Sequence, residues 1–121
     1  MERKRRVLVV DDEPGVLRFI RVGLSVAGYD VTTTSSGEEA LKLAQTGKFE
    51  IMLLDVFMEP MSGLDVLEKL GPKRKLPVIV FSAGVSIVER VMQAGAEAFI
   101  AKPFKPEDLI ARIEEVLKRK K

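Results

Sequence analysis

Side chains that could do chemistry stand directly after four short apolar runs of this sequence. Asp11 and Asp12 follow VLVV, Asp55 follows IMLL, Ser82 follows VIVF, and Lys102 follows AFIA. If these runs are parallel strands of one sheet, their carboxyl ends share an edge and the five side chains converge there. A single aspartate after a strand usually forms a turn or caps a helix, but separate caps have no reason to share one edge. We therefore predict a joint site.

Three carboxylates in one crevice would repel each other strongly. Like charges about 4 Å apart interact by about 4 kcal/mol at an effective dielectric of 20. A divalent cation removes this repulsion, and the available ligands are all oxygens, which favours Mg²⁺ over zinc or copper. The sequence therefore predicts a Mg²⁺ site at Asp11, Asp12 and Asp55, with the ammonium group of Lys102 beside it.

Absent residue types and motifs exclude several classes of site. The chain has no cysteine and no histidine, which excludes zinc-thiolate sites, cysteine nucleophiles and serine–histidine–aspartate hydrolysis. It contains neither GxxxxGK[ST] nor GxGxxG, so P-loop and dinucleotide sites are not expected. The acidic loop at residues 11–13 argues against a flavin phosphate. A small Mg²⁺-dependent phosphatase acting through an aspartyl phosphate stays open as a distant alternative, although the chain lacks length for a cap domain.

The elements that must position these side chains alternate along the chain. Short apolar or β-branched runs, typical of strands covered on both faces, occur at residues 7–10, 30–34, 51–54, 78–81 and 98–101. Apolar residues at helical spacing fill the gaps at residues 16–24, 40–44, 64–70, 87–92 and 109–117. Five strand–helix units in series predict right-handed crossovers and a three-layer α/β sandwich.

Charge and hydropathy limit the expected partners. Basic residues cluster at 3–6 and 118–121, whereas the chain between them is acidic, and aromatic residues make up only 6% with no tryptophan. A nucleic-acid site would need a basic stripe with stacking aromatics, so we expect solvated ends and no direct nucleic-acid contact. No apolar stretch approaches the roughly 20 residues that span a bilayer, and the amino end lacks a signal-peptide core. We expect a cytoplasmic protein with no membrane contact.

Several segments together resemble the signature segments of response-regulator receiver domains. In order, they are VLVVDDEPGVLR, IMLLDVFMEPMSGLDVLEKL, LPVIVFSAG and AGAEAFIAKPF, followed by a closing amphipathic helix. The resemblance covers essentially the whole chain, residues 1–121, as a single receiver domain. It implies a flavodoxin-like fold with a five-stranded parallel sheet in the order 2-1-3-4-5. It also implies a phosphoprotein of two-component signal transduction, a switch that binds other proteins rather than an enzyme.

The resemblance assigns roles to the predicted site. Asp55 matches the phosphoacceptor, and Asp11 and Asp12 match the acidic pair that holds Mg²⁺ with Asp55 and the backbone carbonyl of Phe57. Lys102 matches the lysine that neutralises phosphoryl charge. Because the chain has no histidine, the phosphoryl donor would be a sensor histidine kinase or a histidine phosphotransfer protein.

The resemblance also implies how the domain switches. Ser82 matches the switch hydroxyl, and Phe99 matches the aromatic residue that changes rotamer on activation. The Lys102–Pro103 peptide bond is expected to be cis. A downstream effector protein would bind the face of the fourth helix, fifth strand and fifth helix. Kinase docking is expected beside the first helix, near Pro14, Val16, Phe19 and Val22.

Three features depart from the family pattern. Glu59 stands where the family commonly has proline, with Pro60 following, and we expect its carboxylate to face solvent. The stretch from Ser82 to Gly95 is about two residues short, which predicts a short fourth helix. Phe57 is bulky, and we hypothesise that its ring screens an acyl phosphate from water.

Two interpretations besides the switch stay open from the sequence alone. A receiver-like interaction module that is never phosphorylated is one, and the small phosphatase is the other. Because the chain stops after one amphipathic helix, no DNA-binding or catalytic output domain is expected within it.

Overall fold

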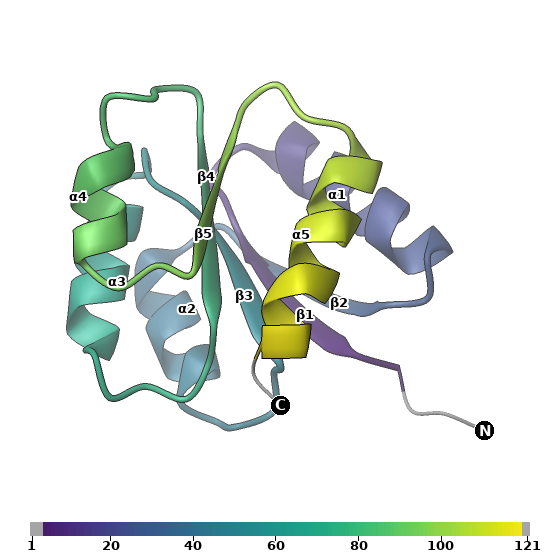
Figure 1. Cartoon of the computed structure of the whole chain (residues 1–121), viewed down its shortest axis with the longest axis horizontal. Coiled ribbons are helices and arrows are strands. Elements are labelled where there is room, and N and C mark those ends of the chain that lie inside the picture. The colour runs from purple at the N-terminus through teal and green to yellow at the C-terminus, as the bar shows by residue number, and fades with distance from the viewer. Residues whose placement is uncertain (1–3, 120–121) are drawn as a thin grey trace.

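A five-stranded parallel sheet in the order β2-β1-β3-β4-β5 forms the centre of the computed structural model, which describes residues 4–119 (Figure 1). Its strands are β1 (Arg6–Val10), β2 (Asp30–Thr34), β3 (Ile51–Asp55), β4 (Val78–Ser82) and β5 (Ala98–Ala101). The predicted fold class and strand order are confirmed. Asp55 and Ser82 end their strands rather than follow them, because both still pair with a neighbouring strand.

Helices cover both faces of the sheet, as the three-layer prediction required. They are α1 (Pro14–Val26), α2 (Gly37–Ala44), α3 (Gly63–Leu70), α4 (Val88–Gln93) and α5 (Pro106–Arg119). α1 and α5 lie on one face, and α2, α3 and α4 lie on the other (Figure 1). Within residues 4–119, no helix has the length and apolar character needed to cross a membrane.

Local sequence signals set the helix boundaries. The Ser36 side chain accepts a hydrogen bond from the backbone N–H of Glu39 at the start of α2, and Ser62 and Asp65 form a reciprocal capping box at α3. Gly28, with φ of 99°, follows the end of α1 in a backbone conformation that favours glycine. In contrast, α4 has six residues and no side-chain cap at its start, so the predicted short fourth helix is confirmed.

Alternate strand residues pack into two separate hydrophobic cores, one on each face of the sheet. Val7 and Val9 of β1 pack under α1 and α5, whereas Leu8 and Val10 pack under α2 and α3, and all four are fully buried. Burying an aliphatic side chain of this size contributes about 1.5–3 kcal/mol. The sheet is therefore held from both sides, and the positions of its strand ends are fixed relative to each other.

Substitution of Gly63 tests the close packing between α3 and β3. A Cβ atom at Gly63 would lie 2.0 Å from the carbonyl oxygen of Asp55, so the backbone must shift to admit alanine. We expect Gly63→Ala to lower the free energy of unfolding by about 2 kcal/mol or more, measured by urea denaturation. The control is Gly15→Ala on α1, where nothing lies within 4 Å and a gain of up to about 1 kcal/mol is expected. Equal stabilities of both variants would contradict this packing.

Candidate functional site

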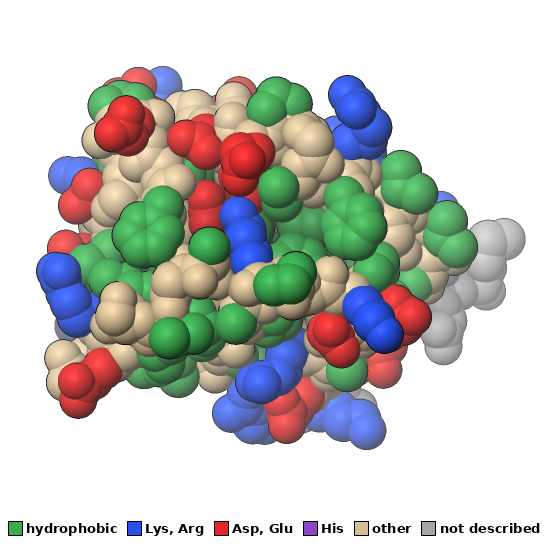
Figure 2. All heavy atoms as spheres, turned by 90° about the horizontal axis from the view of Figure 1, so that it is seen from above, with side chains coloured by type: hydrophobic (Ala, Val, Ile, Leu, Met, Phe, Trp, Pro, Cys, Tyr) green, Lys and Arg blue, Asp and Glu red, His purple; other side chains and the backbone are tan. Residues whose placement is uncertain are grey.

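The carboxyl ends of β1, β3 and β5 bring predicted site residues into contact. The Nζ atom of Lys102 lies 3.2 Å from Asp11 Oδ2 and 3.6 Å from Asp55 Oδ1. Figure 2 looks down on this edge and shows acidic side chains gathered around one basic side chain, with hydrophobic side chains on either side. Residues that are 91 positions apart in the chain, Asp11 and Lys102, therefore form one site.

Asp11, Asp12 and Asp55 form the acidic part of this site. Each offers a carboxylate oxygen, and the three oxygens lie within 4.8 Å of one another. Asp11 is fully buried, Asp55 is 3% exposed and Asp12 is exposed. α1 starts without a side-chain cap, so Asp12 is not the helix cap that a lone aspartate would usually be. An all-oxygen set with one solvent-facing member fits Mg²⁺, which keeps several of its waters.

Burial and neighbouring charges shift the pKa values of Asp55 and Lys102. Burial, followed by the neighbouring charge of Asp11, raises the pKa of Asp55 from 3.8 to about 6, and Lys102 opposes this rise. Burial lowers the pKa of Lys102, but the carboxylates of Asp55 and Asp11 more than compensate and raise it above its ordinary value of 10.5. The Lys102 ammonium group therefore stays charged near neutral pH.

Glu13 is a further member of the site that the sequence did not single out. Its Oε1 atom lies 3.7 Å from Lys102 Nζ, and its side chain is largely exposed. The backbone N–H of Glu13 also donates to Asp11 Oδ1 at 2.9 Å, which holds the Asp11 carboxylate in place. The only available signal was its position directly after the acidic pair, which does not reveal the direction of its side chain.

Ser82 and Phe99 lie on the elements that were predicted for them. Ser82 is buried, and its Oγ atom accepts a hydrogen bond from the backbone N–H of Gly84 at 3.1 Å. The hydroxyl is therefore held by the loop after β4. Phe99, on β5, is half-buried and packs against the core under α2, α3 and α4. The Lys102–Pro103 bond is cis, as the resemblance implied, and Glu59–Pro60 is also cis, which was not anticipated.

Phe57 and Glu59 shape the rim of the site beside α4. The Phe57 side chain is 58% exposed, and its ring carbon Cε2 lies 3.3 Å from where a Cβ atom would stand on Gly84. Glu59 is exposed, which agrees with the prediction that it faces solvent. With Asp12 and Arg90, these residues line a pocket of about 470 Å³. The ring thus lies beside the β4–α4 loop and borders a pocket that Asp12 also lines.

Apolar side chains are exposed on α1, next to the site. Phe19 and Val22 are about half exposed, whereas Val16 packs against the core. Phe19 also lines a groove of about 490 Å³ that reaches Lys102 and Phe104. Of the residues predicted near a docking surface, Pro14, Phe19 and Val22 are therefore accessible and Val16 is half-buried.

The basic ends of the sequence are only partly described by the structure. Lys4, Arg5, Lys118 and Arg119 are exposed, in line with solvated ends. Arg6 instead forms an ion pair, because its Nε atom lies 3.7 Å from Asp30 Oδ2. The remaining basic positions, Arg3, Lys120 and Lys121, lie outside the described residues.

Known proteins share this sequence and arrangement. The response regulator receiver domain family matches residues 7–114. The transcriptional regulatory protein KdpE of Mycobacterium tuberculosis is 40% identical over 115 residues, which are 93% of this chain and 51% of that protein. A CheY-like receiver domain protein of Methanospirillum hungatei superimposes with a TM-score of 0.89 at 30% identity, covering 98% of this chain and 97% of that one.

A third similar structure carries ligands. The response regulator TrrA of Thermotoga maritima, in complex with Mg²⁺ and BeF, matches with a TM-score of 0.84 at 29% identity over 92% of this chain and 97% of that one. The chain spans about half the length of the curated relatives it matches, several of which are named transcriptional regulators.

The raised pKa of Asp55 predicts a pH dependence of stability. Folded protein binds the Asp55 proton more tightly than unfolded protein, so without divalent cations this group lowers the free energy of unfolding as pH rises from about 4 to 6. The loss is at most about 3 kcal/mol. We expect Asp55→Asn to remove this slope and to be more stable than wild type at pH 7.5 in EDTA, measured by urea denaturation. Parallel pH profiles of the two proteins would contradict the shifted pKa.

Proposed function

This chain belongs to the response regulator receiver domain family of two-component signalling, and we propose that it is a switch in which Asp55 accepts a phosphoryl group. The observation that carries the proposal is the Asp55 carboxylate, buried at a strand end, 3.6 Å from the ammonium of Lys102 and grouped with Asp11 and Asp12. A nucleophile, a cation-binding pair and a fixed positive charge are the parts that phosphoryl transfer needs.

The acidic group has the ligand chemistry of a magnesium site. Asp11, Asp12 and Asp55, with the backbone carbonyl of Phe57 and waters, would hold the ion. When bound, Mg²⁺ supplies positive charge that offsets both the carboxylate repulsion and the charge of the transferred phosphoryl group. The similar TrrA structure is a complex with Mg²⁺ and BeF, which supports the same assignment for the related site of this chain.

The residues of the chain itself account for the transfer step. A carboxylate oxygen of Asp55 bonds to phosphorus while the bond from phosphorus to the imidazole nitrogen of the donor breaks, and the imidazole leaves with the electron pair. Lys102 remains protonated and faces the phosphoryl oxygens. Since the chain has no histidine, the donor belongs to a sensor histidine kinase or histidine phosphotransfer protein. The exposed Phe19 and Val22 on α1 support docking beside that helix.

Phosphorylation would then act on Ser82. The product carries about −1.5 to −2 charge and three acceptor oxygens. Ser82 Oγ now accepts from the N–H of Gly84, and in the active state its hydroxyl donates to a phosphoryl oxygen instead, which draws in the β4–α4 loop. Phe99 turns inward into the vacated space. The surface of α4, β5 and α5 changes as a result and binds a downstream effector protein.

We assign residues 1–121 to one receiver domain that works in the cytoplasm, without catalytic turnover and without direct nucleic-acid contact of its own. The relatives named transcriptional regulators are about twice as long as the portion that matches. Any contact with DNA in those proteins therefore does not transfer to this chain through the receiver match alone.

Labelling of Asp55 tests the proposed acceptor. We expect wild type incubated with acetyl phosphate and Mg²⁺ to gain one phosphoryl group, detected by intact mass and mapped to the peptide with residue 55. Asp55→Asn should abolish the label, whereas Asp30→Asn, an exposed aspartate at the far end of β2, should keep it. Unlabelled wild type would favour a module that is never phosphorylated, and steady turnover of a phosphomonoester would favour a phosphatase.

Removal of the Phe57 ring tests its role in the lifetime of the acyl phosphate. An attacking water needs access in line with the bond that breaks, and the exposed ring lies beside that path, against Gly84. We expect Phe57→Ala to raise the rate of phosphate loss by about threefold or more, followed by intact mass after removal of the donor. Val26→Ala, an exposed apolar residue at the end of α1, is the control. An unchanged or slower rate in Phe57→Ala would refute the screening role.

A further inference from the structure

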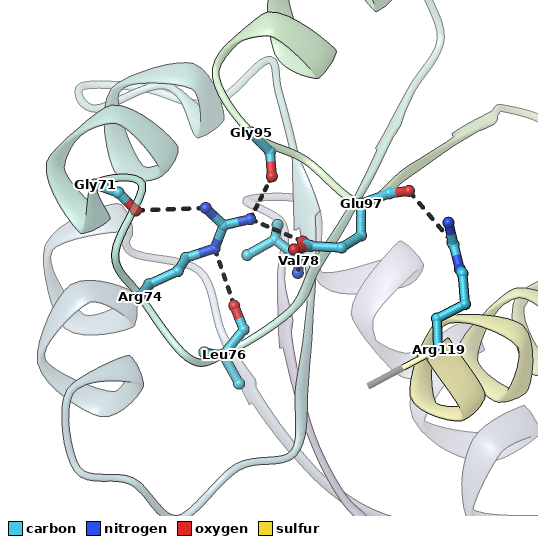
Figure 3. A network of polar contacts seen from close by, with 7 residues as sticks. All are labelled: Gly71, Arg74, Leu76, Val78, Gly95, Glu97 and Arg119. Carbon is cyan, nitrogen blue, oxygen red and sulfur yellow. Dashed lines mark hydrogen bonds and ion pairs between the residues drawn. The ribbon is translucent and has the colours of Figure 1, made fainter. Parts of the chain in front are cut away.

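Arg74 and Glu97 form a partly buried ion pair beside the starts of β4 and β5, at the end of these strands opposite Ser82. Figure 3 shows the pair and its neighbours. Arg74 Nη2 lies 2.8 Å from Glu97 Oε1, and the two side chains are only 7% and 23% exposed. The guanidinium also donates to the carbonyl oxygens of Leu76 at 2.9 Å, Gly71 at 3.4 Å and Gly95 at 2.5 Å. One side chain therefore joins the end of α3, the α3–β4 loop and the loop after α4.

Glu97 extends this contact into the sheet and to α5. Its Oε1 atom accepts from the backbone N–H of Val78 at 2.7 Å, and its own N–H donates to the carbonyl of Val78 at 2.9 Å. Its carbonyl accepts from Arg119 on α5 at 3.5 Å (Figure 3). Val78 is the first residue of β4, so these bonds fix the start of β4 against the start of β5. We call the Arg74–Glu97 pair with these hydrogen bonds the far-edge anchor.

The opposite ends of the same elements are held much less firmly. α4 begins at Val88 without a side-chain cap, and Ala83, Val85 and Ser86 of the preceding loop are exposed. The end of α4, in contrast, runs into Gly95, whose carbonyl is bound by Arg74 and whose φ is 106°. α4 therefore has a fixed end at the far-edge anchor and a weakly held end next to Ser82.

We propose that the far-edge anchor holds the end of α4 in place during the switch, so that within residues 83–97 the backbone change that follows phosphorylation is confined to residues 83–91, with Gly95 as the fixed point of α4. Breaking this partly buried ion pair would take the guanidinium away from the carbonyls of Gly71, Leu76 and Gly95, so the anchored end resists rearrangement. Motion is taken up at the loop after Ser82, which is largely exposed and leads into the uncapped start of α4. This inference rests on the proposed function, because it concerns how the phosphorylated site moves its surroundings.

Arg74 and Glu97 are thus positioning residues that act on Ser82 through the backbone. The anchor sets the register at the start of β4 and β5. At the other end of these strands, Ser82 ends β4 and Lys102 follows β5, and the Lys102 N–H donates to the Ser82 carbonyl at 2.8 Å. Displacement of the Ser82 hydroxyl is transmitted along a strand that cannot slide. The loop and the first turn of α4 must therefore absorb it.

Hydrogen exchange of the phosphorylated and unphosphorylated protein tests the inference. Glu97→Gln keeps an oxygen that can accept from Val78 but removes the charge, and Arg74→Lys keeps the charge but removes the planar set of donors. Arg112→Ala is the matched control, because Arg112 makes an exposed ion pair with Glu115 on α5 at 3.9 Å. Each protein is labelled with acetyl phosphate and Mg²⁺, checked by intact mass, and compared with its unlabelled form.

Within residues 83–97 of wild type and of Arg112→Ala, we expect phosphorylation to change exchange only at residues 83–91. In Glu97→Gln and Arg74→Lys the change should extend through residues 92–97, with exchange there about tenfold faster in the phosphorylated form, the factor expected for losing one charge-assisted hydrogen bond. If Arg74→Lys does not fold, Glu97→Gln decides the question alone.

Three results would overturn the inference. Exchange that rises equally in both forms of the variants, with the wild-type difference pattern unchanged, would show a purely structural role. A wild-type response that already includes residues 92–97 would show that the far edge is not fixed. Wild type that takes no phosphoryl group would remove the proposed function and this inference together, and the mass measurement separates that case from the other two.

Discussion

Repulsion among Asp11, Asp12 and Asp55 is the interaction on which the rest of the molecule depends. Nothing in the geometry of a parallel sheet requires acidic residues at its strand ends, and buried carboxylates destabilise the fold unless something offsets their charge. Burial, followed by the neighbouring charge of Asp11, raises the pKa of Asp55 to about 6, which shows this cost. Two packed cores hold the strands in fixed positions, so the carboxylates cannot relax by moving apart. This uncompensated charge suits the site to the cation and the phosphoryl group that we propose for it.

Charged groups are arranged differently at the two ends of the parallel strands. We call the end with the far-edge anchor the far edge, and the end with the acidic site the near edge. At the far edge, one guanidinium meets one carboxylate and three carbonyls, and Figure 3 shows the cation surrounded by acceptors. At the near edge, Lys102 lies within 4 Å of carboxylates from Asp11, Glu13 and Asp55, so acceptors exceed donors. The first arrangement is satisfied and resists change. The second has more carboxylates than cations, as the proposed cation binding and switching require.

Prediction from the sequence succeeded where one rule of topology was enough. Parallel strands place their carboxyl ends at one edge, so the convergence of Asp11, Asp55 and Lys102 followed from the alternation of strands and helices. The far-edge anchor could not be found in this way. Arg74 lies in the run Lys73–Lys75, which resembles a solvated loop, and its partner is 23 residues away. The direction of a loop side chain depends on its rotamer and on which backbone carbonyls the loop leaves without a hydrogen bond. Neither property produces a periodic pattern in the sequence. The bond between the Ser82 hydroxyl and Gly84 was hidden for the same reason.

The shortage of cations at the near edge also explains why the proposed switch uses a neutral hydroxyl. Lys102 is already shared among three carboxylates, and an added phosphoryl group brings about −1.5 to −2 further charge. A second ammonium able to meet that charge would bind the carboxylates in the resting state and hold the loop closed. Ser82 instead has a hydroxyl that rests on a backbone N–H of its own loop and gains a strong acceptor only when the phosphoryl group is present. The difference between the two states is therefore concentrated in one hydrogen bond, placed on the largely exposed loop between β4 and α4.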